Sequence, residues 1–427
     1  MDAELLFLIL LMSAAGAALG TFSGLVPGIH VNTLAALMLS FYTVLDSFLS
    51  DLFPSGYSGL LIASCIISAA VVHSSVDFVP SVFLGAPDPD EVMNILPGHR
   101  LLMEGKGMIA VRSAAIGSAV GSMTAVVVAI PLQYVMSSGL SDVLEMYTPA
   151  VLITVIGILL VKENGSILWA AVLTVFSGCL GYVCMSVPAP VSVIPGSLLF
   201  PLLTGLFGIP AMLLSTKSGE VPEQSDPVHF PVGYKEGLKG VLTGGIVGWF
   251  PGITATAGAA VASSFTEDTG KEGFISLVSS IGSASAVFAL VTLSVTGKGR
   301  SGTMLAVSDI LGNSVSGTGS VFLAMLLTVS IAVVLGYCIT IGSGKLLSRT
   351  VAGKSLGHVN FIVIVSIVIL VFLMTGPLGI LVLSASAALG LIPTAAGVGR
   401  VHLTGCLTIP AVIFYLGLNL PKILFFL

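Results

Sequence analysis

The chain has 427 residues, of which 55% are hydrophobic and only 8% are charged, and its mean hydropathy is +1.10. Because ordinary globular domains carry roughly 25% charged residues, this composition excludes a water-facing fold. The net charge of −5 is spread over loops and offers no basic surface for nucleic acid. The composition therefore indicates a protein embedded in a membrane.

Apolar runs that are long enough to cross about 30 Å of hydrocarbon recur from one end of the chain to the other. We count about 10–12 of them, near residues 5–45, 57–86, 108–136, 147–161, 167–187, 191–215, 240–265, 274–296, 303–342, 359–375, 377–393 and 403–426. Segments such as Phe361 to Met374 are apolar on every side, which favours helices over the alternating strands of a barrel. The sequence predicts an all-α, polytopic membrane protein.

Two of these runs carry a glycine at every fourth position, at a constant offset from one another. The eight glycines are Gly16, Gly20, Gly24 and Gly28 in the first run, and Gly240, Gly244, Gly248 and Gly252 in the second. Each ladder ends in Pro-Gly-Ile, at Pro27 and at Pro251, and a small polar cluster follows. Matched hydrophobic segments interrupted by glycine and proline are typical of the binding site of a transporter.

The longest polar stretch separates two apolar halves of similar length. We therefore divide the chain into a first membrane repeat (1–215), a polar connecting segment (216–239) and a second membrane repeat (240–427). Basic residues gather near 100–112 and 345–354, and the positive-inside rule places both groups in the cytoplasm. The two groups follow different numbers of apolar segments in their halves, which predicts repeats of inverted orientation.

The Pro-Gly elements are the candidate substrate site. Proline removes a backbone donor and ends a helix, so we expect breaks at Pro27 and Pro251. Where a helix restarts, its free N–H groups and the positive end of its dipole bind anions. The alternative interpretation is two kinked, closely packed helices without a ligand. The candidate substrate-binding residues are Pro27, Gly28, His30, Asn32, Thr33, Pro251, Gly252, Thr254 and Thr256.

Asp77 is the candidate for ion coupling, since a carboxylate within an apolar run is costly and tends to face a cavity. It would carry a proton, or hold a sodium ion together with Ser74 and Ser75; the alternative is a hydrated residue at the end of a segment. The corresponding stretch of the second half offers Ser283 and Ser285, without a charge.

Lys298 and Arg300 lie in a glycine-rich loop and are possible contacts of an anionic substrate. The alternative for this loop is an anchor on the cytoplasmic side of the membrane.

Motifs of enzymes are missing from the sequence. It contains no His-Glu-x-x-His, no Gly-x-Ser-x-Gly and no phosphate-binding P-loop. We therefore predict no enzymatic activity, no ATP-driven pump, and no cofactor beyond a coupling Na⁺ or H⁺. The five cysteines lack metal-type spacing, and the acidic run 86–91 is interpreted as a hydrated loop, so no metal site is expected. The first four residues carry no positive charge, so no cleaved leader is expected.

The doubled Gly-x-x-x-Gly-x-x-Pro-Gly-Ile resembles the large membrane subunit of tripartite tricarboxylate transporters. The stretch from Leu96 to Gly107 also resembles a loop of that family, although Gly98-His99-Arg100-Leu101 departs from its pattern. The resemblance covers both halves, and the chain is similar to a stand-alone archaeal branch. More distantly, the repeat plan resembles that of polyprenyl-phosphate translocases.

The resemblance implies a prokaryotic, multi-pass cell-membrane protein that takes up a carboxylate with a sodium or proton gradient. It implies as partners a small membrane subunit and an extracellular binding protein, and a homo-oligomer is possible. The first hypothesis is thus a secondary transporter of an organic anion that works by alternating access. The second is a translocase of a lipid phosphate, which Lys298, Arg300 or Arg100 would contact. A third, from another class, is an intramembrane enzyme or a purely structural membrane protein.

Overall fold

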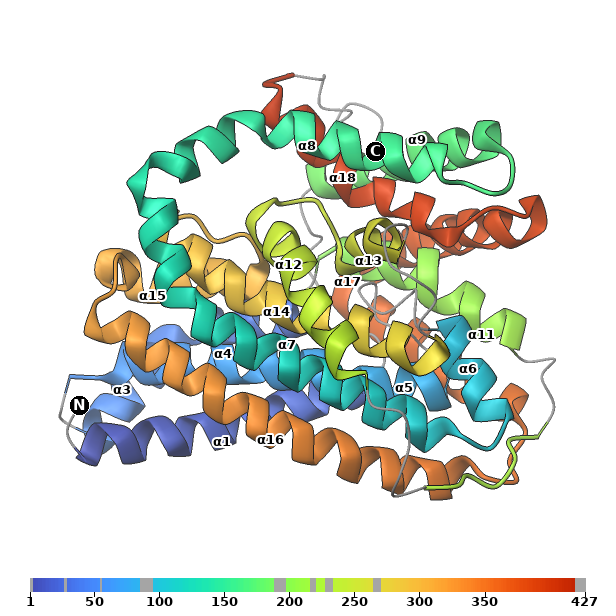
Figure 1. Ribbon diagram of the computed structural model, residues 1–427. Coiled ribbons are helices and arrows are strands. Elements are labelled where there is room, and N and C mark those ends of the chain that lie inside the picture. Colours follow the sequence, from blue (N-terminus) through green and yellow to red (C-terminus); the bar gives the residue numbers. More distant parts are fainter. Residues whose placement is uncertain are drawn as a thin grey trace.

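The computed structural model is a bundle of long helices (Figure 1). The structure describes residues 3–26, 29–53, 56–84, 95–187, 197–215, 220–226, 233–263 and 270–418. The helices before the connecting segment are α1 (Ala3–Leu25), α2 (Val31–Ser40), α3 (Tyr42–Leu52), α4 (Ser58–Val76), α5 (Phe78–Phe83), α6 (Ile95–Met103), α7 (Gly107–Val135), η2 (Met136–Leu140), α8 (Ser141–Val161), α9 (Ile167–Ser186), α10 (Leu199–Leu203), η3 (Thr204–Gly208) and α11 (Ile209–Ser215). The later helices are α12 (Tyr234–Trp249), α13 (Ala255–Ser263), α14 (Gly270–Thr296), α15 (Gly302–Leu311), η4 (Gly312–Val315), α16 (Ser320–Val351), α17 (Leu356–Ala396), η5 (Arg400–Thr404) and α18 (Gly405–Tyr415).

Within the described residues, seven helical stretches are long and apolar enough to cross a membrane, or eight if the pair α2–α3, bent by 72°, forms one span. The seven cover Ala3–Leu25, Ser58–Phe83, Gly107–Val161, Ile167–Ser186, Gly270–Thr296, Ser320–Val351 and Asn360–Ala396. The prediction of a polytopic helical membrane protein is confirmed. The count from the sequence was higher because it included apolar runs that form shorter helices, such as α12 and α18, and because it divided two of the long stretches, Gly107–Val161 and Asn360–Ala396, in two.

The first glycine ladder packs α1 against α4. Gly16 lies against Cys65 and Ser68, and Gly20 lies against the backbone of Ala69. A side chain at either glycine would overlap a carbonyl oxygen of α4, so the absence of a Cβ is what lets the two backbones approach.

The second ladder repeats this packing between α12 and α14. Gly240 lies against Leu277 and Ser280, and Gly248 lies against Ser285 and Phe288. In both pairs the contacts advance in the same direction along the two helices, so α4 runs parallel to α1 and α14 runs parallel to α12. The two ladders therefore build equivalent helix pairs.

Two further long helices, α7 and α16, each pack on helices from the other half of the chain. Helix α7 runs parallel to α14, since Gly117 lies against Ser276 near one end and the Gln133 amide donates to the Ser294 hydroxyl (2.8 Å) near the other. Helix α16 lies against α4 and runs antiparallel to α7. Figure 1 accordingly shows α1, α4 and α16 running in one direction and α7, α12 and α14 in the other.

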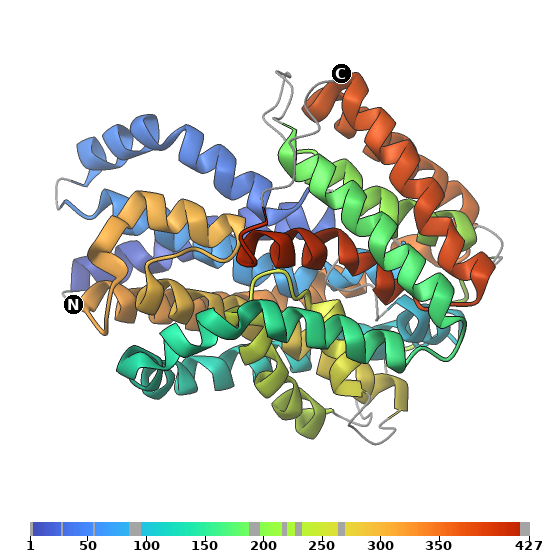
Figure 2. The same ribbon diagram turned by 90° about the horizontal axis from the view of Figure 1, so that it is seen from above.

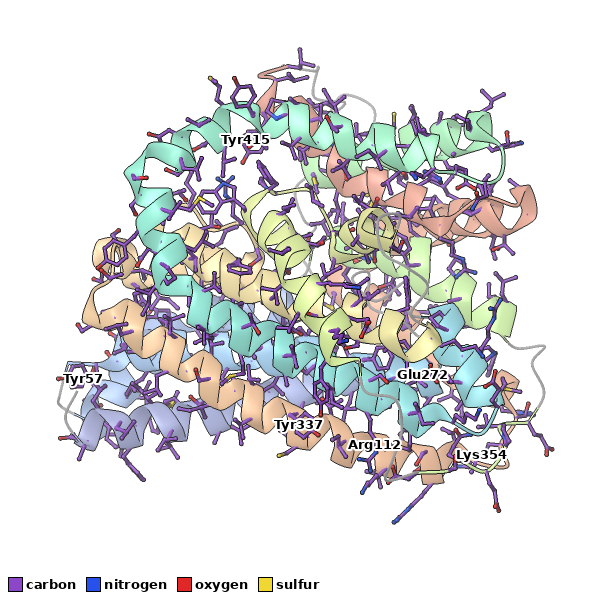
Figure 3. All side chains as sticks on the ribbon, in the orientation of Figure 1. Tyr57, Arg112, Glu272, Tyr337, Lys354 and Tyr415 are labelled. Atoms are coloured by element: carbon purple, nitrogen blue, oxygen red, sulfur yellow. The ribbon has the colours of Figure 1, made fainter. Side chains whose placement is uncertain are left out.

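Both basic clusters lie on the same face of the bundle. The carboxylate of Asp226, in the connecting segment, accepts the guanidinium of Arg112 at 2.7 Å and lies 3.4 Å from the ammonium of Lys345. Figure 3 shows Arg112 and Lys354 toward the end of the bundle that lies opposite Tyr57. A single carboxylate thus binds one cation from each half, which agrees with the expectation that both clusters face the same side of the membrane.

We expect Gly20→Ala to destabilise the protein by roughly 1–3 kcal/mol, because its methyl group overlaps the Ala69 carbonyl and a backbone oxygen has little room to move. The matched control is Gly157→Ala in α8, where the methyl group meets open space and alanine favours the helix. Thermal unfolding of both variants in detergent measures the difference. Equal melting temperatures would contradict the role given to the ladder.

Candidate functional site

The first break lies between α1, which ends at Leu25, and α2, which begins at Val31. The predicted site residues Pro27 and Gly28 lie outside the described residues. His30 caps α2, because its Nδ1 accepts the backbone N–H of Asn32 at 3.1 Å. Its ring lies 5.1 Å, between centroids, from the ring of His73 in α4. The first predicted polar cluster is thus fixed to the helix that packs on α1.

Asn32 reaches across to the other half of the chain. Its Oδ1 accepts the backbone N–H of Thr303 at 3.0 Å, in the first turn of α15. Gly302 lies against the same side chain. Thr33 donates its backbone N–H to the carbonyl of His30 at 2.9 Å and so closes the first turn of α2. The first break is therefore joined to the loop that precedes α15.

The second break lies between α12, which ends at Trp249, and α13, which begins at Ala255. Gly252 has a φ of +87°, a conformation that glycine adopts without strain, and its carbonyl accepts the hydroxyl of Thr408 at 2.8 Å. Pro251 is half-buried beside it. Thr254 accepts the N–H of Ala257 at 3.1 Å and caps α13.

Thr256, the last of the predicted substrate-binding residues, is fully buried in the first turn of α13. Its hydroxyl therefore lies inside the protein, in the helix that restarts after the second break.

The basic loop before α15 carries one tethered guanidinium and one exposed ammonium. Arg300 is half-buried and donates to the hydroxyl of Tyr415 in α18. Lys298 is 60% exposed and pairs with Glu145 in α8 at 2.5 Å. The structure therefore separates the two cations that the sequence treated together: Arg300 points to α18, and Lys298 lies at the surface.

These contacts form three hydrogen-bonded pairs that are linked along the chain by the start of α15 and by α18, and we call them the break network. It consists of Asn32, Thr303, Arg300, Tyr415, Thr408 and Gly252. Helix α18 holds the second break through Thr408 and the guanidinium through Tyr415. Figure 2 shows α18 in the middle of the view, where it packs against α8 and α9. The sequence did not predict the roles of Thr408 and Tyr415, which lie in the last apolar run.

The predicted ion-coupling residues of the first half lie at the end of α4. Asp77 is only 6% exposed, and Gly24 of the ladder lies against its backbone nitrogen. The hydroxyls of Ser74 and Ser75 donate to the carbonyl of Val71 at 3.0 and 3.3 Å. The structure therefore places a buried carboxylate beside the first break, with both serines bonded to their own helix.

Their counterparts in the second half are Ser283 and Ser285 of α14. The Ser285 hydroxyl donates to the carbonyl of Gly282 at 2.7 Å. Ser283 is 1% exposed, and its hydroxyl has no hydrogen-bond partner among the described residues. Ser285 also lies against Gly248 of the second ladder, as His73 lies against Gly24 in the first half.

The sequence analysis missed a buried, hydrogen-bonded pair formed by Glu163 and His402. The Glu163 Oε2 lies 2.7 Å from the His402 Nε2, and the two side chains are 9% and 1% exposed. Burial raises the pKa of Glu163, but hydrogen bonds from the N–H groups of Gly399 and Gly165, together with His402, outweigh that effect and lower the pKa below its usual range. The signal in the sequence was a lone histidine at the start of an apolar run.

A groove with a volume of about 1070 Å³ opens beside the second break. Its walls come from α8, α12 and α13, and Ile253 and Gly258 lie among its lining residues. Lys239 is the one charged side chain in this lining, and the rest is mainly apolar. The second break is thus reached from the side of α8 as well as from α18.

A polytopic helical bundle with two matched, interrupted helices has the architecture of a membrane transport protein. The chain belongs to the tripartite tricarboxylate transporter TctA family, whose family model matches residues 10–405. It is 26% identical over 341 residues to an uncharacterized protein, MJ1079, of Methanocaldococcus jannaschii, which covers 78% of this chain and 79% of that protein. No solved structure matches the chain. The protein is therefore a multi-pass membrane protein of a transporter family.

Proposed function

We propose that this protein is a secondary transporter that moves an organic anion, a carboxylate, across the cell membrane by alternating access. The break network is the observation that carries the proposal, because a half-buried guanidinium is tethered to α18, the helix that also bonds the second break, and lies three residues before Thr303, which bonds the first. Membership of a tricarboxylate transporter family supports a substrate with carboxylate groups.

The chemistry of Arg300 supports an anionic substrate. Its guanidinium is always charged and presents a planar fork of donors that matches a carboxylate. Tyr415 takes one of these donors, whereas the buried Nε has no hydrogen-bond partner among the described residues. Buried donors are nearly always paired. A carboxylate bound in the break network would supply the missing acceptor.

Opposed helix directions support alternating access. The matched ladder pairs α1–α4 and α12–α14 run in opposite directions, as expected for an inverted repeat. We propose that residues 1–215 and 240–427 form the two repeats and that the segment 216–239 connects them. Rocking of one repeat against the other would expose the break network to each side in turn.

Ion coupling belongs to the same proposal. Asp77, with Ser74 and Ser75, lies next to the first break, and Ser283 and Ser285 lie on the matching helix of the second repeat, where Ser285 contacts Gly248 as His73 contacts Gly24. We propose these residues as candidates for a coupling ion. A small membrane subunit and an extracellular binding protein are the proposed partners by family membership.

Purified protein in liposomes tests the function. We expect uptake of labelled citrate that depends on an imposed sodium or proton gradient. The double variant Asn32→Ala/Thr256→Ala should lose this uptake while it keeps the size-exclusion profile of the unaltered protein. Movement of a labelled polyprenyl phosphate between leaflets, without uptake of citrate or other soluble carboxylates, would replace the proposal with a lipid-carrier translocase.

A further inference from the structure

We propose that the Glu163–His402 pair is a proton-binding site that controls the second break through α18. The inference rests on the proposed transport function and adds a proton site that is separate from the candidate residues around Asp77. It begins from burial: within the part of the chain that the structure describes, this pair joins an acid and a base whose side chains are both less than 10% exposed. Burying such a pair costs desolvation free energy, so its presence points to a functional role.

The proposed proton acceptor of the pair is the ring of His402. Glu163 accepts N–H groups from Gly165 (2.7 Å) and Gly399 (2.9 Å), so its carboxylate is held in the ionised form. Imidazole is the side chain that commonly changes charge near neutral pH. A proton from the aqueous side is taken up by the ring of His402, and the charge of the pair changes from −1 to zero. The proton is released from the same ring when the site faces the other side.

Proton binding changes the free energy of burying the pair. A lone buried carboxylate is expensive, whereas a carboxylate beside an imidazolium is compensated. Proton binding therefore favours the packing of η5 against the turn between α8 and α9, where Glu163 lies. Because η5 leads directly into α18, this packing also positions α18.

Helix α18 connects the pair to the second break. His402, Thr404 and Thr408 line one small cavity with a volume of about 10 Å³, which is close to the space that one water needs. The hydroxyl of Thr408 bonds the carbonyl of Gly252 at 2.8 Å and that of Thr404 at 3.2 Å. The same helix ends at Tyr415, which tethers Arg300. A shift of η5 would thus reach both the break and the guanidinium.

Other titratable groups lie near the pair, and their titration must be distinguished from that of the pair. Lys162 precedes Glu163 in the turn, and Arg400 lies on η5, where burial lowers its pKa. The neighbouring α9 and α18 carry the buried thiols Cys184 and Cys406. Lysine, arginine and buried thiols titrate well above neutral pH. A transition near neutral pH at this place is therefore assigned to the pair.

Trp249 reports on the second break without any substrate. It is the last residue of α12, is 4% exposed, and packs in the apolar cluster that contains Val401, the neighbour of His402. The chain has two tryptophans, and Trp169 is 47% exposed. In a Trp169→Phe background, the pH dependence of the remaining emission therefore follows the break.

We expect this emission to change through a single transition near neutral pH. His402→Gln should remove the transition, because it removes the ring that takes up the proton, and Glu163→Gln should move the transition to lower pH, because a neutral amide no longer stabilises the imidazolium. His99→Gln, in α6, is the matched control and should keep the transition. A transition that persists in His402→Gln would overturn the proposal. If His402→Gln does not fold, Glu163→Gln, which keeps the size and an acceptor oxygen, decides the question.

Liposomes separate coupling from a purely structural latch. Glu163→Gln should lose citrate uptake driven by a pH gradient but keep exchange of internal for external labelled citrate. Equal loss of both modes, together with a lower melting temperature, would overturn the proposal in favour of a structural role. If citrate does not move in the unaltered protein, the proposed function fails, and the emission of Trp249 still decides the proton site.

Discussion

Replacing Arg300 with glutamine should lower the apparent affinity for citrate in liposomes about 100-fold, which corresponds to roughly 2.7 kcal/mol. The reason is that glutamine keeps polarity but removes the charge and the fork of donors in the break network. Arg300→Lys should recover only part of the affinity, because an ammonium ion keeps the charge without the planar geometry. Initial rates of uptake over a range of citrate concentrations measure the effect.

Lys298→Gln is the matched control for this prediction. It removes a positive charge from the same loop, but Lys298 is 60% exposed and pairs with Glu145, so uptake should change less than about twofold. Tyr415→Phe should give an intermediate loss of about tenfold, since it removes one hydrogen bond that orients the guanidinium. If Lys298→Gln were the damaging variant and Arg300→Gln transported normally, the anion site would lie elsewhere.

A methyl group at Gly252 should cost roughly 2–5 kcal/mol of stability and stop transport, for two additive reasons. A left-handed backbone costs about 1–2 kcal/mol for a residue with a Cβ, and Gly252 has a φ of +87°. Overpacking adds about 1–3 kcal/mol, since the new Cβ would lie 2.6 Å from the Cβ of Ala411. Thermal unfolding and citrate uptake of Gly252→Ala measure the two consequences.

Two further variants separate these contributions. Gly353 has a comparable backbone conformation, with a φ of +70°, but a methyl group there meets nothing within 4 Å. Gly353→Ala should therefore lose only the stability that the backbone strain costs. Adding Ala411→Gly to Gly252→Ala should remove the loss of stability that comes from overpacking. The loss that comes from the left-handed backbone should remain. No difference between Gly252→Ala and Gly353→Ala would contradict the close contact between the second break and α18.

Local sequence patterns predicted the helices and the places where they end. Proline and glycine act on the backbone within one or two turns, so the breaks after Leu25 and Trp249 were visible without coordinates. The glycine ladders likewise indicated which helix face would be approached closely. They did not identify the partners, because a bare helix face packs equally well against any neighbour of suitable shape.

Residues that act together across the fold were harder to predict. Asn32 and Thr303 are separated by 271 residues, and Gly252 and Thr408 by 156. The pairing of Glu163 with His402 requires the turn between α8 and α9 to lie against the buried helix η5, which depends on how α8, α9, α17 and α18 pack. The distant hydrogen-bond partner of a hydroxyl or of a lone histidine cannot be predicted from the local sequence pattern.

Composition and periodicity by themselves determined that this protein is a helical membrane protein with two matched, interrupted helices, because burial in hydrocarbon and backbone geometry act residue by residue. Only the tertiary structure decided that Arg300 is tethered to α18 whereas Lys298 lies at the surface, and that Glu163 and His402 are buried together. The physical reason is that hydrogen bonds and ion pairs inside a membrane protein depend on which helix faces meet, and long-range packing sets those faces.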